Sequence, residues 1–138
     1  NEYDPFGNIN YIVHNDNTNI VYLWSYNGQY LVAEIKDATY EQASKAVSEV
    51  FGMTIDALSK AVNPDASKLQ LLYKNTNLTN ALVTTYTYRP LTGILTMTGP
   101  SGLITYFDYD IFGRLKESYI IENGQKKILQ ANDYHYQK

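Results

Sequence analysis

The sequence predicts an α+β protein that is mainly antiparallel β, in which hairpin meanders form an open curved sheet with two or three short inserted helices. Three observations indicate this fold. Tyrosine, which favours half-buried pleated surfaces, supplies 14 of the 138 residues. Glycine- and asparagine-containing turn signals recur at short intervals. The hydrophobic period lengthens from two residues to about 3.6 only in the middle of the chain.

The length suits a single domain, 1–138, with one modest core. Within it we expect an N-terminal β meander over residues 1–37 and a helical insertion over residues 38–76. A C-terminal meander of five or six strands is expected over residues 80–138, because short turn signals separate runs with a period of two.

Three strands are predicted before the helices. Residues 9–14 alternate, and positions 20–26 are rich in β-branched and aromatic residues. The Asn-Gly pair at 27–28 is the strongest short hairpin signal, because both turn positions need positive φ. Residues 29–36 form the returning strand. The Asn-Asp-Asn-Thr-Asn run at 15–19 lacks the spacing and the bidentate Glu of an EF-hand calcium loop, so a hairpin loop is favoured.

The helical insertion carries its own start and stop signals. Thr39 is followed three residues later by glutamine, which is a capping-box pattern, and Gly52 can end the first helix. Thr54 opens a second short helix. The Asn-Pro pair at 63–64 predicts the start of a third helix that runs to about Tyr73. Because helices this short are unstable alone, we expect them to pack on one face of the sheet.

One turn sequence occurs twice. Asp110 and Gly113 hold the first and fourth positions of a type I turn, where a carboxylate accepts turn amides and glycine tolerates positive φ. A copy with proline at the second position lies near the start of the chain, and a tyrosine precedes both turns. The residues assigned to these turns are Tyr3, Asp4 and Gly7 in the first copy, and Tyr109, Asp110, Gly113 and Arg114 in the second.

The turn belongs to a repeating hairpin. Gly93 and Gly113 lie 20 residues apart. Stacked hairpins would form an aromatic ladder across neighbouring strands, and stacking is required because one hairpin cannot bury its own face. The aromatic pairs expected at equivalent positions are Tyr86 and Tyr88, Phe107 and Tyr109, and Tyr134 and Tyr136.

These residues resemble a known repeat. Residues 106–117, YFDYDIFGRLKE, are similar to the tyrosine-aspartate (YD) repeat of the Rhs family of large bacterial surface and secreted proteins, whose pattern is roughly Tyr-Asp-x-x-Gly-Arg-Leu. In the first copy Asn8 replaces the arginine. Residues 21–36 and 83–115 resemble Rhs-type proteins of Bacteroidetes. The helical stretch lies outside the repeat pattern, although similar insertions are typical of that bacterial subgroup.

The resemblance implies an architecture. In that family, YD repeats wind a β-sheet into a hollow shell that encloses or carries a variable C-terminal region, often a toxin. It therefore implies a non-enzymatic scaffold segment at the cell surface or outside the cell, with the rest of the parent chain as its partner. It implies no cofactor. No catalytic residue is carried over, because the family's self-cleaving aspartyl motif is not visible.

A carbohydrate-binding or adhesion module is the alternative function, with a glycan or a surface protein as the partner. Exposed tyrosine rings can stack on sugars, and adhesion and carbohydrate binding have been proposed for the related repeats of animal teneurins. The candidate residues are Tyr86, Tyr88, Tyr106, Tyr109, Tyr134 and Tyr136.

Composition argues against several other kinds of site and partner. The net charge of −3 predicts no attraction to nucleic acid, and no apolar run approaches the roughly 20 residues that span a bilayer. The absence of cysteine excludes disulfides and thiolate chemistry. His14 and His135 lack metal-spaced partners, so no metal site is expected. Open sheet edges would allow self-association.

Asp108 and Asp110 alternate at one strand end, as paired catalytic carboxylates can. A turn-capping role for Asp110 is favoured, because it also explains the recurrence of an aspartate at Asp4.

Overall fold

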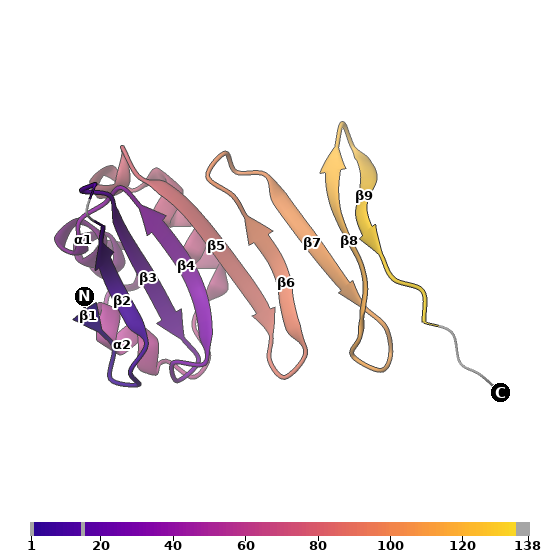
Figure 1. Ribbon diagram of the computed structural model, residues 1–138, viewed down its shortest axis with the longest axis horizontal. Coiled ribbons are helices and arrows are strands. Elements are labelled where there is room, and N and C mark those ends of the chain that lie inside the picture. Colours follow the sequence, from indigo (N-terminus) through magenta and orange to yellow (C-terminus); the bar gives the residue numbers. More distant parts are fainter. Residues whose placement is uncertain (1, 15, 135–138) are drawn as a thin grey trace. The chain divides into compact units, whose positions relative to one another are not determined.

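The structure is a computed structural model that describes residues 2–14 and 16–134. It confirms a mainly antiparallel open sheet with a few short helices. Within the described residues, nine strands are hydrogen-bonded in the order in which they occur along the chain (Figure 1). Each strand therefore lies beside the strand that precedes it in the sequence, which is the topology of a meander.

The strands are β1 (Glu2–Tyr3), β2 (Ile9–Val13), β3 (Asn19–Ser25), β4 (Tyr30–Lys36), β5 (Leu82–Arg89), β6 (Gly93–Thr98), β7 (Ile104–Tyr109), β8 (Leu115–Glu122) and β9 (Gln125–Ala131). The helices are α1 (Tyr40–Phe51), α2 (Ile55–Lys60) and the 3₁₀ helices η1 (Ala66–Lys74) and η2 (Thr76–Leu78).

The chain divides into two compact units, Asn1–Thr85 and Tyr86–Lys138. The first unit contains β1 to β4, all the described helices and the first part of β5. The second contains the rest of β5 and strands β6 to β9.

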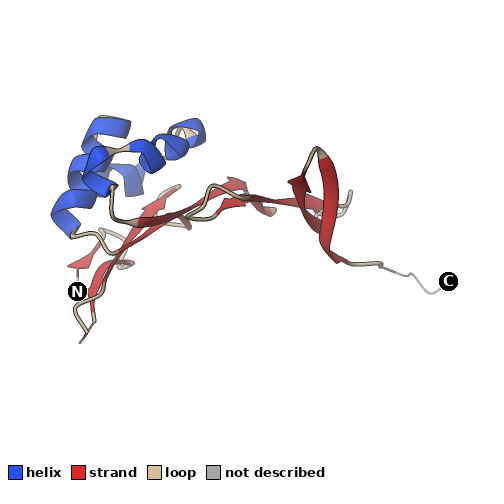
Figure 2. Ribbon diagram, turned by 90° about the horizontal axis from the view of Figure 1, so that it is seen from above, coloured by secondary structure: helices blue, strands red, loops and turns tan. Residues whose placement is uncertain are grey.

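The first unit has two layers, because its helices lie on one face of its strands (Figure 2). Burying this face provides most of the stabilisation, since an amphipathic helix and a half-apolar sheet each need a partner. Leu23 and Ile35 face the helices and are fully buried. The other buried apolar residues of this core are Val21, Val32, Ala33, Ala38, Ala43, Ala46, Val47, Phe51, Ile55, Leu58, Leu69, Leu72, Leu78 and Val83.

The first two helices begin where the sequence predicts. The Thr39 hydroxyl accepts a hydrogen bond from the Gln42 amide at 3.1 Å, and the Gln42 side chain accepts one from the Thr39 amide at 2.9 Å. Gly52 ends α1 with a φ of 70°. Thr54 caps α2, which ends at Lys60.

The third helix differs from the prediction in its start and type. Asp65, not the Asn-Pro pair before it, is the N-cap, because its carboxylate accepts hydrogen bonds from both the amide and the hydroxyl of Ser67, at 3.1 and 2.5 Å. The helix is 3₁₀ rather than α. Its buried residues, Leu69 and Leu72, are three apart, which places both on one side of a helix with three residues per turn.

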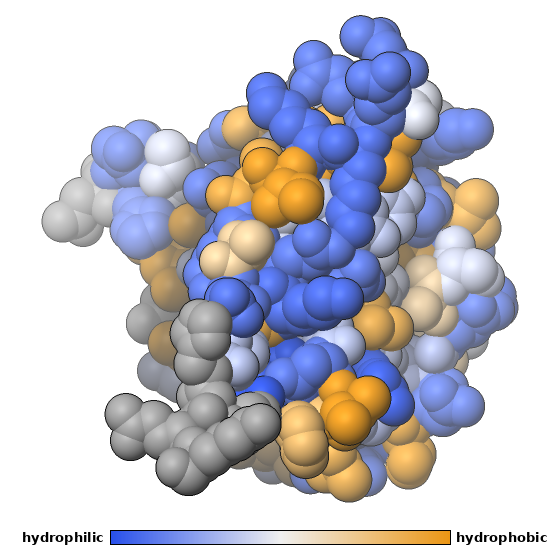
Figure 3. Space-filling model, turned by 90° about the vertical axis from the view of Figure 1, so that its right-hand side faces the viewer, coloured by the Kyte–Doolittle hydropathy of each residue, from blue (hydrophilic) through white to orange (hydrophobic). Residues whose placement is uncertain are grey.

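The second unit has little core of its own. Among the described residues from Tyr86 onward, Ile120 is the single apolar side chain that is buried. Every residue of β9 is exposed, and Ile128 and Leu129 each retain 54% of their accessible surface. The surface seen from this end of the chain is largely hydrophilic, with separate hydrophobic patches (Figure 3). This unit therefore depends on hydrogen bonds between strands and on contacts between hairpins.

Candidate functional site

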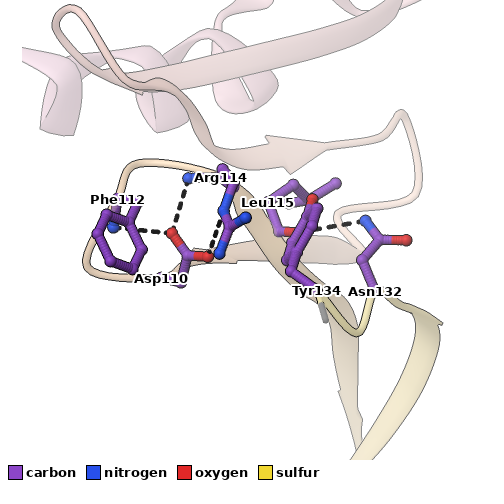
Figure 4. A network of polar contacts seen from close by, with 6 residues as sticks. All are labelled: Asp110, Phe112, Arg114, Leu115, Asn132 and Tyr134. Carbon is purple, nitrogen blue, oxygen red and sulfur yellow. Dashed lines mark hydrogen bonds and ion pairs between the residues drawn. The ribbon is translucent and has the colours of Figure 1, made fainter. Parts of the chain in front are cut away.

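The turn between β7 and β8 is built around one carboxylate. Oδ1 of Asp110 accepts hydrogen bonds from the amides of Phe112 at 2.9 Å and Arg114 at 3.0 Å, and Oδ2 accepts one from Arg114 Nε at 2.8 Å (Figure 4). The Gly113 amide donates to the Asp110 carbonyl at 3.0 Å, and the Asp110 amide donates to the Arg114 carbonyl at 2.8 Å. Gly113 has a φ of 76°, which favours glycine.

The turn between β1 and β2 repeats this arrangement bond for bond. Oδ1 of Asp4 accepts from the amides of Phe6 at 2.8 Å and Asn8 at 2.9 Å. The backbone bonds from Gly7 to Asp4 and from Asp4 to Asn8 are 3.0 and 2.8 Å. Oδ2 accepts from Asn8 Nδ2 at 3.0 Å, so the asparagine amide takes the place that Arg114 holds in the second turn.

Two further hairpins use the same backbone turn without an aspartate at its start. The Gly99 and His14 amides donate to the carbonyls four positions later, of Leu103 at 3.0 Å and of Thr18 at 2.9 Å. Their own carbonyls accept from the amides three positions later, of Gly102 and Asn17, both at 3.0 Å. The residue at the fourth position again has positive φ, 87° at Gly102 and 64° at Asn17. The sequence pattern did not identify these as copies, because it requires the aspartate.

The Asp110 carboxylate is ionised over the physiological range. Partial burial acts to raise its pKa, but the hydrogen bonds from the Arg114 and Phe112 amides and the charge of the Arg114 guanidinium together outweigh burial. The pKa is therefore lower than its usual value of 3.8.

The guanidinium of Arg114 also lies over two rings. Its Cζ is 4.0 Å from the centroid of Tyr134 and 5.2 Å from that of Phe112. The Leu115 carbonyl accepts hydrogen bonds from Asn132 Nδ2 at 3.2 Å and from the Tyr134 hydroxyl at 2.8 Å (Figure 4). The segment after β9 is thus attached to the turn before β8.

Three aromatic side chains each donate a hydrogen bond to the hairpin that precedes them in the chain. The Tyr109 hydroxyl donates to the carbonyl of Ile94, near the start of β6, at 2.7 Å. Tyr134 makes the equivalent bond to the first residue of β8. In the first unit, Trp24 Nε1 donates to the carbonyl of Ile9, the first residue of β2, at 2.9 Å. We call these three residues the aromatic donors; each bonds the outgoing strand of the preceding hairpin.

Burial raises the pKa of Tyr109, so its hydroxyl remains a donor across the physiological range. Trp24 was not predicted to have a role. Its bond crosses 15 residues of sequence, and no local pattern reveals it.

A second aromatic cluster lies on β7, β8 and β9. The rings of Tyr106 and Tyr119 stack with centroids 5.3 Å apart and an interplanar angle of 16°. Lys126 Nζ lies 4.4 Å from the Tyr119 centroid and bonds Glu117, which raises the pKa of the lysine. Tyr119 was absent from the predicted set, because its position does not follow the aromatic spacing.

The remaining carbohydrate candidates are distributed along the second unit. Tyr86 and Tyr88 are half-buried on β5, and Tyr106 and Tyr109 are half-buried on β7. Tyr134 is exposed, and Tyr136 lies outside the described residues, as does His135. The hydroxyls of Tyr109 and Tyr134 already donate to backbone carbonyls, which leaves neither hydroxyl proton for a sugar.

An open hollow of about 390 Å³ adjoins the Asp110 turn, and its lining residues are Arg89, Thr92, Tyr109, Asp110, Ile111 and Gly113. Over residues 2–14 and 16–134, no group of three His, Cys, Asp or Glu side chains is placed to hold a metal ion. The helices of that same part of the chain are all too short or too polar to cross a membrane.

No protein-family model and no curated protein matches this chain. Its function is therefore inferred from the turns, the aromatic donors and the sheet.

We predict that Asp110→Asn makes stability less dependent on acid pH. Because the folded-state pKa of Asp110 is lowered, the carboxylate stabilises the fold above the unfolded-state pKa near 3.8 and loses this effect as pH falls through the folded value. Melting temperatures measured across the acid range should show wild type exceeding the variant near neutrality and approaching it at low pH.

Asp37→Asn is the matched control, since no carboxylate hydrogen bond is found for Asp37 within the described part of the chain. The difference in melting temperature between wild type and Asp37→Asn is the baseline for judging the effect of Asp110→Asn. A constant gap between wild type and Asp110→Asn at all pH values would contradict the role given to this carboxylate.

We predict that Tyr109→Phe lowers the free energy of unfolding by about 0.5–1.5 kcal/mol, because it removes one hydroxyl bond and leaves the Ile94 carbonyl without that donor. Urea unfolding measures the change. Tyr22→Phe, at a half-buried tyrosine on β3, should be near neutral. Equal effects of the two substitutions would show that the Tyr109 bond contributes nothing.

Proposed function

We propose that this chain is a non-enzymatic scaffold segment of a large Rhs-type cell-surface or secreted protein, in which its hairpins form part of a β-shell. The observation that carries the proposal is the duplicated turn. Asp4 and Asp110 accept the same two turn amides and a third bond from the side chain four residues on, at distances that agree within 0.2 Å. Such agreement supports a repeated unit of the YD type.

The contacts between hairpins support a scaffold role. Each aromatic donor bonds a strand of the preceding hairpin, so neighbouring hairpins within each unit are joined by a side chain as well as by the sheet. The second unit buries little apolar surface within itself, as expected of a segment that is stabilised by neighbours on either side. The rest of the parent chain would supply those neighbours, outside the cell or at its surface.

The chemistry of the described residues supports a structural role over a catalytic one. The Asp110 carboxylate is engaged by three donors, which favours the turn-capping interpretation over a catalytic pair with Asp108. A general base needs free lone pairs directed at a substrate. The turn uses those lone pairs to fix the backbone.

A carbohydrate-binding or adhesion module is the second candidate. The Tyr106–Tyr119 stack, with Lys126 beside it, is the observation that favours it, because half-buried tyrosine rings can pack on a sugar.

The test is a titration of the ¹⁵N-labelled protein with a panel of mono- and oligosaccharides, together with hydrolase assays. We expect no saturable shift at millimolar sugar and no turnover, because Tyr106 and Tyr119 pack on each other and the turn carboxylates are engaged. Two results would contradict the scaffold proposal. One is a shift that Tyr119→Ala abolishes and Tyr22→Ala preserves. The other is turnover that a single substitution removes.

A further inference from the structure

Tyr3 occupies the same structural position as Tyr109. Each directly precedes the aspartate of a turn, and each follows a β-bulge, between Glu2 and Tyr3 or between Asp108 and Tyr109. Their cross-strand partners also correspond, since Tyr3 pairs with Ile9 and Tyr109 with Leu115, in both cases the first residue of the outgoing strand.

The two tyrosines differ in their surroundings. Tyr109 bonds the Ile94 carbonyl and packs against Gly93, where an added Cβ would lie only 2.5 Å from the tyrosine hydroxyl oxygen. Tyr3 is 57% exposed. Within residues 2–14 and 16–134, no acceptor for its hydroxyl is found, and β1 is the end strand of the sheet.

Comparison of the two tyrosines shows which partner Tyr3 lacks among the described residues: a strand whose carbonyl accepts its hydroxyl. At Tyr109, the acceptor is a strand that runs antiparallel to β7 and begins with glycine at Gly93. At the β1 edge, the equivalent place is empty of any described strand, although the turn, the bulge and the tyrosine are already formed.

We infer that the β1 edge is a strand-binding site in which Tyr3 recognises an extended segment running antiparallel to β1. The Tyr3 hydroxyl donates to a backbone carbonyl near the start of that segment, and a glycine before the carbonyl leaves room for the ring. The site rests on the proposed scaffold function, because such a segment is the outgoing strand of a neighbouring hairpin.

The opposite end of the sheet is less suited to adding a strand. The edge strand β9 carries Lys126 and Lys127 and has a bulge in its pairing with β8. Lysines and bulges on an edge strand oppose pairing with another chain. The pairing of β1 with β2 also has a bulge, but β1 carries no lysine, and its tyrosine supplies a donor.

The test uses a synthetic peptide of residues 92–99, which contains the β6 strand that Tyr109 contacts. Titrated into the ¹⁵N-labelled full chain, it should cause saturable shifts at the amides of Glu2 and Tyr3 in the millimolar range. Tyr3→Phe should weaken binding about two- to tenfold, the value of one hydrogen bond. Tyr22→Phe should not change it.

A peptide carrying Gly93→Val should bind less tightly, because its side chain would meet the Tyr3 ring. The inference is overturned if shifts are absent at β1, if they occur only along β9, or if Tyr3→Phe binds the peptide as tightly as wild type. If the peptide test fails and the sugar titration shows no binding, the strand-binding inference is wrong but the scaffold proposal stands. Saturable sugar binding overturns the scaffold proposal, whatever the result with the peptide.

Discussion

The hydrogen bonds between a turn aspartate and the amides two and four residues later are the interaction on which the β1–β2 and β7–β8 hairpins depend. At Asp4 and Asp110 one carboxylate oxygen satisfies two turn amides, and the other oxygen holds the side chain that begins the outgoing strand. This fixes the length of the turn. A fixed turn length sets the register of the two strands, because a slip of one residue would reverse the faces of every side chain.

Register in turn places the aromatic donors. The register shift beside Tyr109 leaves Lys116 of β8 as the extra residue, and the Tyr109 hydroxyl reaches the Ile94 carbonyl of the preceding hairpin. Trp24 makes the same kind of bond in the first unit, also after a bulge. The donor can therefore be a phenol or an indole, provided that an N–H or O–H lies at the end of a large ring. The fold of each hairpin and its attachment to the next depend on the same few residues.

The parts of the fold that are governed by local chemistry could be predicted from sequence. The Thr39 capping box and the Asp110 turn each involve residues no more than four positions apart. The start of η1 was predicted too early, because Asp65 rather than Asn63 caps the helix through its bonds to Ser67. The aromatic donors and the Tyr106–Tyr119 stack join residues 13 or more positions apart, so no local pattern contains them. The hairpin loop predicted after residue 14 is present between β2 and β3, but its likeness to the aspartate turns lies in the backbone alone and could not be predicted from the sequence.

Amide hydrogen exchange at the two aspartate turns is the most direct test of the shared turn. The amides of Phe6 and Asn8 bond Asp4, as those of Phe112 and Arg114 bond Asp110, so all four should exchange more slowly than the amide of Ile111, which is 94% exposed at the tip of its turn. We expect matching protection at both turns. Exchange at the rate of an unstructured peptide at either turn would show that the carboxylate does not hold that turn, and the account of a repeated hairpin would be wrong.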